Sequence, residues 1–370
     1  MRITTLLFVV AVAGCDSASE DPGETDNPFA VFGDAETNPG DWVWIPVAES
    51  TCRDGSSTGF GFRYHSGATS AVIYLDGGGA CYDAFTCSLN RSRFSESDFE
   101  NVAGTSATRG FFNLDRSESP FSESHQAFFS YCTGDLHSAS SVDVDVPGVT
   151  AQQQFVGYDN VTQFLRIVDP YLKSLNIQNL IVAGSSAGAL GAMINYPKIK
   201  SSYPNIPVDL ITDALPLFND TDVMPACFQS HTAEVMKLLV PVNCAECSDP
   251  DRGGFSNLYD YLSTSYPGEN FAMISSSQDL FWRGLLGSAL PGSCPARDLL
   301  DGAIYETGLK KLRDEVLKPA GNWSTYFWDG LEHTLLFDED NVYGPGIGGT
   351  NAAEWATSIS SGQPVHLGLD

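Results

Sequence analysis

The sequence predicts an α/β fold with a central, mostly parallel sheet and helices on both faces. Short apolar runs with the length and composition of buried strands recur along the chain, and segments with apolar residues at helical spacing separate them. Strands that alternate with helices in this way are typical of a parallel sheet. The runs that carry the prediction are AVIYL, NLIVAG, VDLITD, FAMIS and TYFW, which begin at residues 71, 179, 208, 271 and 325.

The N-terminus has the pattern of an export signal. One basic residue, Arg2, precedes an apolar run from Leu6 to Ala13, which is shorter than the roughly 20 residues that span a bilayer. The ending AVAGC resembles the bacterial lipobox, so we predict a signal peptide over residues 1–14 and a lipid on Cys15. The alternative is an ordinary cleaved signal with a cysteine nearby. The prediction places the protein in the bacterial cell envelope, exported and bound to a membrane through the lipid, with the choice of membrane open.

The segment after Cys15 has the composition of a tether. Residues 15–41 are acidic, rich in Pro, Gly and Ser, and poor in apolar side chains, so they bury too little surface to fold. Apolar content rises at Trp42 and stays high. We therefore predict one catalytic domain over residues 42–370.

Charge and cysteine content narrow the possible partners. The chain has 19 Lys and Arg against 46 Asp and Glu, a formal charge of -27, which argues against nucleic acid because phosphate binding needs a basic surface. Apart from Cys15 there are eight cysteines, and an even number in an exported chain predicts disulfides. Half of a zinc site at Cys244 and Cys247 is the weaker alternative, because no second CxxC or HxxxH accompanies it.

A G-x-S-x-G pattern, which can mark a nucleophilic serine, occurs twice. One copy is Gly55–Gly59, centred on Ser57, and the other is Gly184–Gly188, centred on Ser186. A nucleophile elbow needs a strand before the serine and a helix after it. NLIVAG and AGALGAMINY supply both around Ser186, whereas Ser57 lies in a turn that leads into a strand. The context favours Ser186, with a packing turn that has no chemistry as the alternative.

A glycine-rich loop that can bind an oxyanion follows the strand AVIYL. Gly77, Gly78 and Gly79 let backbone N–H groups face a ligand without side chains in the way. Cys81 and Cys87 lie six residues apart and can close this loop with a short disulfide ring. The other donor of an oxyanion hole usually follows the nucleophile.

Three of the six histidines follow Ser186 and are candidates for the base. His231 comes too soon for an acid-bearing strand to intervene, and His366 is close to the end of the chain. His333 follows the strand TYFW, where the base of a Ser, acid, His order belongs. The acid should follow an intermediate strand, and Asp279 after FAMIS is favoured over Asp213, which comes only one strand after the serine.

With these motifs, the sequence resembles the pectin acetylesterase family, which includes the carboxylesterase Notum and is similar to α/β-hydrolases. The resemblance spans residues 42–336 and rests on CRDGSSTGFGF, YLDGGGAC, YCTGD, AGSSAGALGA, SSSQDLFW and LEHTLL, in that order. It implies a Ser-Asp-His triad, with three backbone oxyanion donors. The residues it designates are Ser186, Asp279 and His333 for the triad, and Gly78, Gly79 and Ala187 for the donors.

The resemblance also implies a disulfide between Cys52 and Cys132. Cys81–Cys87 is the other pair that we predict, and the order of pairing among the remaining four cysteines stays open. Two positions depart from the family pattern, because Gly79-Ala80 stands where many members have an aromatic residue and Gln278 stands where many have tyrosine. Both positions lie close to where the substrate would bind.

We therefore predict an exported serine carboxylesterase that removes an acyl group, in the first place acetyl, from a polysaccharide or a related ester. This chemistry requires no cofactor and no metal. Two alternatives remain. The same triad would serve an esterase for longer acyl chains or polyesters, with an apolar pocket drawn from Leu215, Leu217, Phe218, Leu280 and Phe281. A surface lipoprotein that binds glycans without catalysis is the other.

Overall fold

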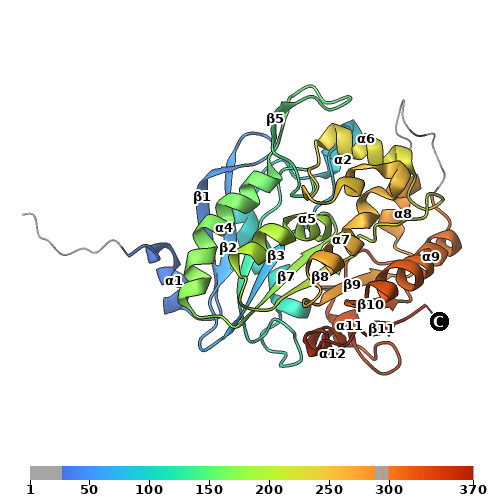
Figure 1. Ribbon diagram of the computed structural model, residues 1–370. Helices are drawn as coiled ribbons and strands as arrows, with labels where there is room; N and C mark the ends of the chain where they lie inside the picture. Colours follow the sequence, from blue (N-terminus) through green and yellow to red (C-terminus); the bar gives the residue numbers. More distant parts are fainter. Residues whose placement is uncertain (1–26, 288–293, 295–298, 370) are drawn as a thin grey trace, which may run out of the picture.

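The computed structural model describes residues 27–287, 294 and 299–369 (Figure 1). Its centre is a nine-stranded sheet with the strand order β1-β2-β4-β3-β7-β8-β9-β10-β11, and β5 pairs with β6 in a separate ribbon. The strands are β1 Trp42–Thr51, β2 Ser57–Arg63, β3 Ser70–Leu75, β4 Ser124–Phe129, β5 Ser141–Val144, β6 Gln153–Phe155, β7 Asn179–Ser185, β8 Val208–Asp213, β9 Phe271–Ser276, β10 Trp323–Trp328 and β11 His366–Leu367.

Helices lie on both faces of this sheet (Figure 1). They are α1 Gly33–Thr37, α2 Ala84–Leu89, α3 Glu96–Ala103, α4 Gly157–Ser174, α5 Ala187–Ser202, α6 Ala226–Met236, α7 Asn257–Ser265, α8 Leu280–Gly287, α9 Gly302–Lys311, α10 Lys318–Ala320, α11 Glu339–Tyr343 and α12 Ala352–Ser358. The longest, α4 and α5, pack against each other and against strands of the sheet. The predicted fold class is confirmed.

The alternation of side chains along β3 separates two hydrophobic cores. Ala71, Ile73 and Leu75 join the core that contains the buried residues of α4 and α5. Val72 and Tyr74 point the other way and join the core under α11 and α12. Successive side chains of a strand point to opposite faces, so a strand buried on both sides appears in the sequence as a continuous apolar run.

The five strands predicted from apolar runs are β3, β7, β8, β9 and β10. They are consecutive in the sheet and parallel, and each is paired with the next over four to six residues. Their carboxyl ends therefore meet at one edge, where ligands of open α/β sheets bind. The antiparallel strands β1 and β2 lie outside this group, at the other side of β4.

The predicted boundary between tether and domain at residue 41 is wrong. Residues 1–26, which include the predicted signal peptide and Cys15, lie outside the described residues. Within residues 27–41, however, the chain forms a turn of 3-10 helix at Ala30–Phe32 and then α1. Phe32 is fully buried and stacks on Tyr171 of α4, with ring centroids 3.9 Å apart. The folded part thus begins before Trp42, because two phenylalanines in this acidic segment provide packing that its composition hides.

Four disulfides join the described cysteines. Cys52–Cys132 and Cys81–Cys87 are the two pairs named from the sequence. The order left open is Cys227–Cys294 and Cys244–Cys247. The last bridge leaves no thiolates for the zinc alternative. Within residues 27–287, 294 and 299–369, no helix is long and apolar enough to cross a membrane.

Candidate active site

Ser186 occupies a strained turn between β7 and α5. Its φ and ψ are 53° and -122°, a conformation that non-glycine residues seldom adopt and that clusters at functional sites. Two glycines permit this turn. A Cβ on Gly184 would lie 2.1 Å from the carbonyl oxygen of Gly188, and one on Gly188 would lie 2.0 Å from that of Leu75. The chain therefore needs glycine on both sides of the serine.

Ser57, the alternative serine, lies elsewhere. It is the exposed first residue of β2, without a helix after it. Ser186, by contrast, is 94% buried, with 6% of its surface exposed, at the edge where the parallel strands end.

Ser186, His333 and Asp279 form a continuous hydrogen-bonded chain. The Nε2 atom of His333 lies 2.7 Å from the Oγ of Ser186, and its Nδ1 lies 2.7 Å from Oδ2 of Asp279. A carboxylate only accepts hydrogen bonds, so the N–H at Nδ1 donates a hydrogen bond to Asp279, and Nε2 is left to accept one from the serine hydroxyl. These are the three side chains that the sequence designated, and the tautomer is the one that base catalysis by Nε2 requires.

The carboxylate of Asp279 is held from its other side as well. It is completely buried just before α8, and its Oδ1 accepts a hydrogen bond of 2.8 Å from the backbone N–H of Trp282. The capping bond orients the carboxylate toward the imidazole. The ring of Phe281 packs against that of His333, with centroids 4.5 Å apart.

Asp213, the alternative acid, has a different position. It ends β8 beside Ser185 and is fully buried. Its carboxylate accepts hydrogen bonds from the hydroxyl of Ser185 and from the backbone N–H groups of Leu335 and Leu336. Asp213 therefore contacts the segments of both the serine and the histidine. Of the two carboxylates, that of Asp279 is the one that bonds the imidazole.

The glycine loop after β3 lies against the nucleophile. A Cβ on Gly77 would meet the Cβ of Ser186 at 3.3 Å. Gly78 and Gly79 have φ of 143° and 78°, which side chains other than hydrogen rarely allow. Gly79 and Ala187 line the cavity at Ser186, whereas Gly78 does not.

Two side chains that sequence reasoning missed hold this loop by its carbonyl groups. Asn90 donates from Nδ2 to the carbonyl of Gly78 at 2.7 Å, and Tyr131 donates from its hydroxyl to that of Gly79 at 3.0 Å. In a trans peptide the carbonyl and the N–H point in opposite directions, so the bond from Asn90 fixes the direction of the Gly79 N–H. Tyr131 lies within the YCTGD motif, which was a usable signal; Asn90 had none.

Burial raises the pKa of two carboxyl groups around this site. The pKa of Asp76, directly before the glycine loop, rises to about 7 because of burial, against which Arg91 and the N–H of Gly77 act. The pKa of Asp213 rises to about 6 for the same reason, offset in part by its backbone donors. Both follow the rule that a low-polarity environment disfavours the charged form.

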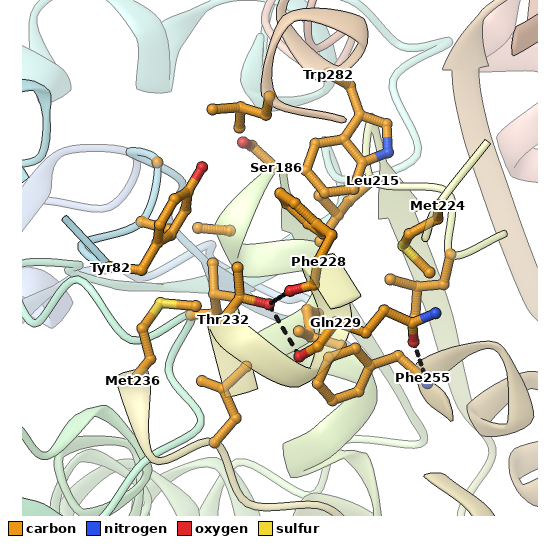
Figure 2. Close-up of a pocket in the computed structure, with 18 of the residues that line it drawn as sticks. Tyr82, Ser186, Leu215, Met224, Phe228, Gln229, Thr232, Met236, Phe255 and Trp282 are labelled. Atoms are coloured by element: carbon orange, nitrogen blue, oxygen red, sulfur yellow. Dashed lines mark hydrogen bonds between the residues drawn. The ribbon is translucent and has the colours of Figure 1, made fainter. Parts of the chain in front are cut away.

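An apolar cavity opens from Ser186 between α5, α6 and α8. Figure 2 shows Ser186 and Trp282 on one side of it and Met236 and Phe255 on the other. Leu215, Leu217 and Phe281 line it, as the alternative acyl pocket required. The other two expected residues do not: Phe218 packs on Tyr305 in the core, and Leu280 is 48% exposed. The space that remains free is about 50 Å³.

The mostly parallel sheet with helices on both faces fits an α/β-hydrolase-like fold, and Ser186, His333 and Asp279 lie at the edge where its parallel strands end. A family model described as Pectinacetylesterase matches residues 40–255, more than half of the chain. The chain therefore belongs to the pectinacetylesterase family.

Individual relatives agree with this membership. Over 223 residues the chain is 26% identical to pectin acetylesterase 11 of Arabidopsis thaliana, covering 55% of this chain and 53% of that protein. Over 212 residues it is 25% identical to the palmitoleoyl-protein carboxylesterase Notum of Drosophila melanogaster, covering 53% and 31%. The chain thus spans about half or less of the length of these curated relatives.

A solved structure is similar over most of the fold. The structure of the Wnt deacylase Notum from Drosophila aligns with a TM-score of 0.62 at 20% identity, covering 88% of this chain and 95% of that one. At this identity the likeness concerns the fold.

Proposed function

We propose that the protein is a serine carboxylesterase that hydrolyses a short acyl ester, in the first place an acetyl ester of a polysaccharide or a related substrate. The observation that carries the proposal is the pair of 2.7 Å contacts from His333 to Ser186 and to Asp279. Nucleophile, base and orienting acid within hydrogen-bond reach are what nucleophilic acyl transfer needs.

In this mechanism Ser186 Oγ attacks the ester carbonyl carbon while Nε2 of His333 takes the hydroxyl proton. The tetrahedral intermediate then breaks its bond to the alcohol oxygen, and the imidazolium returns the proton to the departing alcohol. Water repeats the sequence on the acyl-serine and releases the acid. Throughout the reaction Asp279 holds the imidazole tautomer and stabilises the imidazolium.

The oxyanion donors in this proposal are the backbone N–H groups of Gly79 and Ala187, with Gly78 as the third. Gly79 and Ala187 line the cavity beside Ser186. Asn90 and Tyr131 hold the glycine loop through hydrogen bonds to its carbonyl groups. One such donor contributes on the order of 3 kcal/mol to the transition state.

Cavity size supports a short acyl group. A water molecule requires about 10–15 Å³ of such free space, so about 50 Å³ holds a few solvent-sized atoms. An acetyl group fits without rearrangement, whereas a long chain would require the side chains around it to move.

The lining of the cavity favours a second candidate, an esterase for longer acyl chains. Almost all of its wall is apolar and includes flexible side chains such as Met224 and Met236, which adapt readily to a ligand. The similarity to a palmitoleoyl-protein carboxylesterase is consistent with this candidate.

Export and lipid attachment at Cys15 are part of the proposal. Four disulfides support an oxidising compartment. A Cys15→Ala variant should leave the membrane fraction if the lipid is attached there.

The test is hydrolysis of nitrophenyl esters from acetate to octanoate. We expect acetate to be hydrolysed with the higher kcat/KM, and the Ser186→Ala variant to lose a factor on the order of 10⁴ or more. Ser57→Ala is the matched control and should keep most of the activity. Octanoate as the better substrate would favour the second candidate, and wild-type protein without turnover would favour a glycan-binding protein.

A further inference from the structure

Asp213 is a buried carboxylate that the triad does not use. It is fully buried at the carboxyl end of β8, between β7, which ends at the nucleophile elbow, and β9. The ladder between β7 and β8 pairs it with Ser185, the residue before the nucleophile. A carboxylate without exposure is seldom retained unless several donors satisfy it, so its donors indicate what it does.

The first group of donors belongs to the nucleophile elbow. The hydroxyl of Ser185 donates to Oδ2 of Asp213 at 2.9 Å. In addition, the backbone N–H of Ser186 donates to the main-chain carbonyl of Asp213 at 2.7 Å. Asp213 thus contacts the elbow through both its side chain and its backbone.

The second group belongs to the segment that carries the base. The N–H of Leu335 lies 3.0 and 2.9 Å from the two carboxylate oxygens, and that of Leu336 lies 3.1 Å from Oδ2. Between these donors and His333 stands Thr334, whose φ is 72°. A β-branched residue keeps such a backbone conformation only when its surroundings enforce it.

We propose that Asp213 is a positioning residue that fixes the base segment to the nucleophile elbow and thereby sets the Ser186–His333 contact. The proposal rests on the esterase function above. Its carboxylate does not serve as the triad acid, because the imidazole Nδ1 bonds Asp279. It acts on catalysis through Ser185, Leu335 and Leu336.

The rigidity of this connection decides the rate because the reaction depends on a short donor–acceptor distance. A misplacement of about 1 Å between reacting groups can cost a factor of about 10². On the other side of His333, the hydroxyl of Ser276 donates to the carbonyl of Glu332 at 2.8 Å. The segment is therefore held at two points, and Asp213 supplies the one that is shared with the serine.

Protonation of Asp213 should weaken this connection. Burial raises its pKa to about 6, and a protonated carboxyl has fewer acceptor sites for two N–H groups and a hydroxyl. Two titratable groups interact electrostatically with Asp213. They are His333 in the base segment and Tyr74 on β3. The acidic limb of the wild-type kcat profile should therefore contain an ionisation near pH 6 that belongs to Asp213.

The experiment compares Asp213→Asn with Asp209→Asn in the full-length chain. Asp209 is a matched control, since it lies on the same strand, is 6% exposed, and accepts hydrogen bonds from Asn270 and Ser360 far from the serine. With nitrophenyl acetate we expect Asp213→Asn to lower kcat by roughly 10- to 100-fold and to leave KM almost unchanged. Its acidic limb should contain one ionisation fewer. Asp209→Asn should keep the wild-type kcat and pH profile even where it lowers Tm.

Hydrogen exchange provides a readout that needs no turnover. The amides of Leu335 and Leu336 should exchange at least about tenfold faster in Asp213→Asn than in the wild type, because their acceptor loses its charge, and at wild-type rates in Asp209→Asn. Wild-type exchange rates in Asp213→Asn would overturn the proposal. So would an unchanged kcat in Asp213→Asn with an active wild type. An inactive wild type would reject the esterase function alone, and exchange would still decide on Asp213.

If Asp213→Asn does not fold, Ser185→Ala takes its place. This variant removes one donor at the elbow and keeps the carboxylate, so we expect kcat to fall a few-fold with little change in KM. A wild-type kcat in Ser185→Ala would then overturn the proposal.

Discussion

Asp279 divides its two carboxylate oxygens between a helix and the base. Because one oxygen caps α8 and the other accepts from His333, an amide at this position would place its NH₂ group against one of two donors. We predict that Asp279→Asn lowers kcat by a factor on the order of 10⁴ through the wrong imidazole tautomer, well beyond the loss expected for Asp213→Asn. Steady-state kinetics with nitrophenyl acetate measures it.

The control for this prediction is Asp301→Asn. Asp301 also caps a helix, α9, through the N–H groups of Ala303 and Ile304, and it does not bond the imidazole. An equal loss of kcat in both variants would show that helix capping, rather than the tautomer, explains the effect.

Asp76 links stability to pH at the start of the glycine loop. Its pKa is raised to about 7 in the folded protein and is close to 3.9 in an unfolded chain. The folded state therefore binds the proton more tightly, and this group's contribution to stability is fully present below about pH 4 and is lost as pH rises through 7. The loss amounts to about 1.4 kcal/mol for each pH unit in that window.

Asp76→Asn should remove this term, because the amide oxygen can still accept from the N–H of Gly77. We expect the unfolding free energy of the wild type, relative to the variant, to fall by about 2–3 kcal/mol between pH 5 and pH 8. Urea denaturation at the two pH values measures it. Parallel pH profiles for the two proteins would contradict the assignment.

At the scale of elements, the glycine loop after β3 is held by residues from two other segments. We predict that Tyr131→Phe, which deletes the hydroxyl between the Gly79 carbonyl and the Leu136 N–H, lowers kcat about fivefold, since one hydrogen bond is worth about 1 kcal/mol. A boronic acid that forms a tetrahedral adduct with Ser186 should lose affinity by a similar factor. Tyr203→Phe, whose hydroxyl bonds Asp169 away from the loop, should change neither quantity.

The elements that sequence reasoning found are those whose pattern is local. β3, β7, β8, β9 and β10 are continuous apolar runs because both of their faces are buried, and the elbow is marked by Gly184 and Gly188. The turn at Ala30–Phe32 and α1 were missed, because their stability comes from Phe32 on Tyr171, a residue far along the chain.

The same distinction applies to the site. Ser186 and His333 follow from strand context and chain order. Spacing favours Asp279 over Asp213 as the acid, but it is weak evidence. Asp213 ends β8 and Asp279 follows β9, so both lie at the same edge of the sheet. Only the directions of their side chains show which one bonds His333. Tyr131 was marked only by its place in the YCTGD motif, and Asn90 could not be deduced from pattern, because its role depends on the path of the loop that it holds.

At the scale of the whole molecule, the two disulfides named from the sequence should act differently. Cys52–Cys132 closes 80 residues and Cys81–Cys87 closes 6. The chain-entropy relation gives about 4.5 kcal/mol for the larger loop and about 2 kcal/mol for the smaller. We predict that the double variant Cys52→Ala, Cys132→Ala mainly lowers Tm. The double variant Cys81→Ala, Cys87→Ala should instead mainly lower kcat, with a smaller fall in Tm.

Thermal unfolding and kinetics on both double variants test this division. The small ring lies directly after the glycine loop, so its loss should loosen the oxyanion donors while most of the core stays intact. A large fall in Tm with normal kcat for the Cys81 and Cys87 variant would be the opposite result.

The burial of Phe32 also sets a distance limit on the whole protein. Because Phe32 packs against α4 and the carbonyl of Asn27 already accepts a hydrogen bond from Ala30, the proposed anchor at Cys15 is joined to the domain through only the residues before Asn27. Even fully extended, the stretch from Cys15 to Asn27 reaches about 40 Å. An enzyme held in this way would work within a thin shell above its membrane, so its substrates would be the esters of the adjacent envelope layer or molecules that diffuse into it.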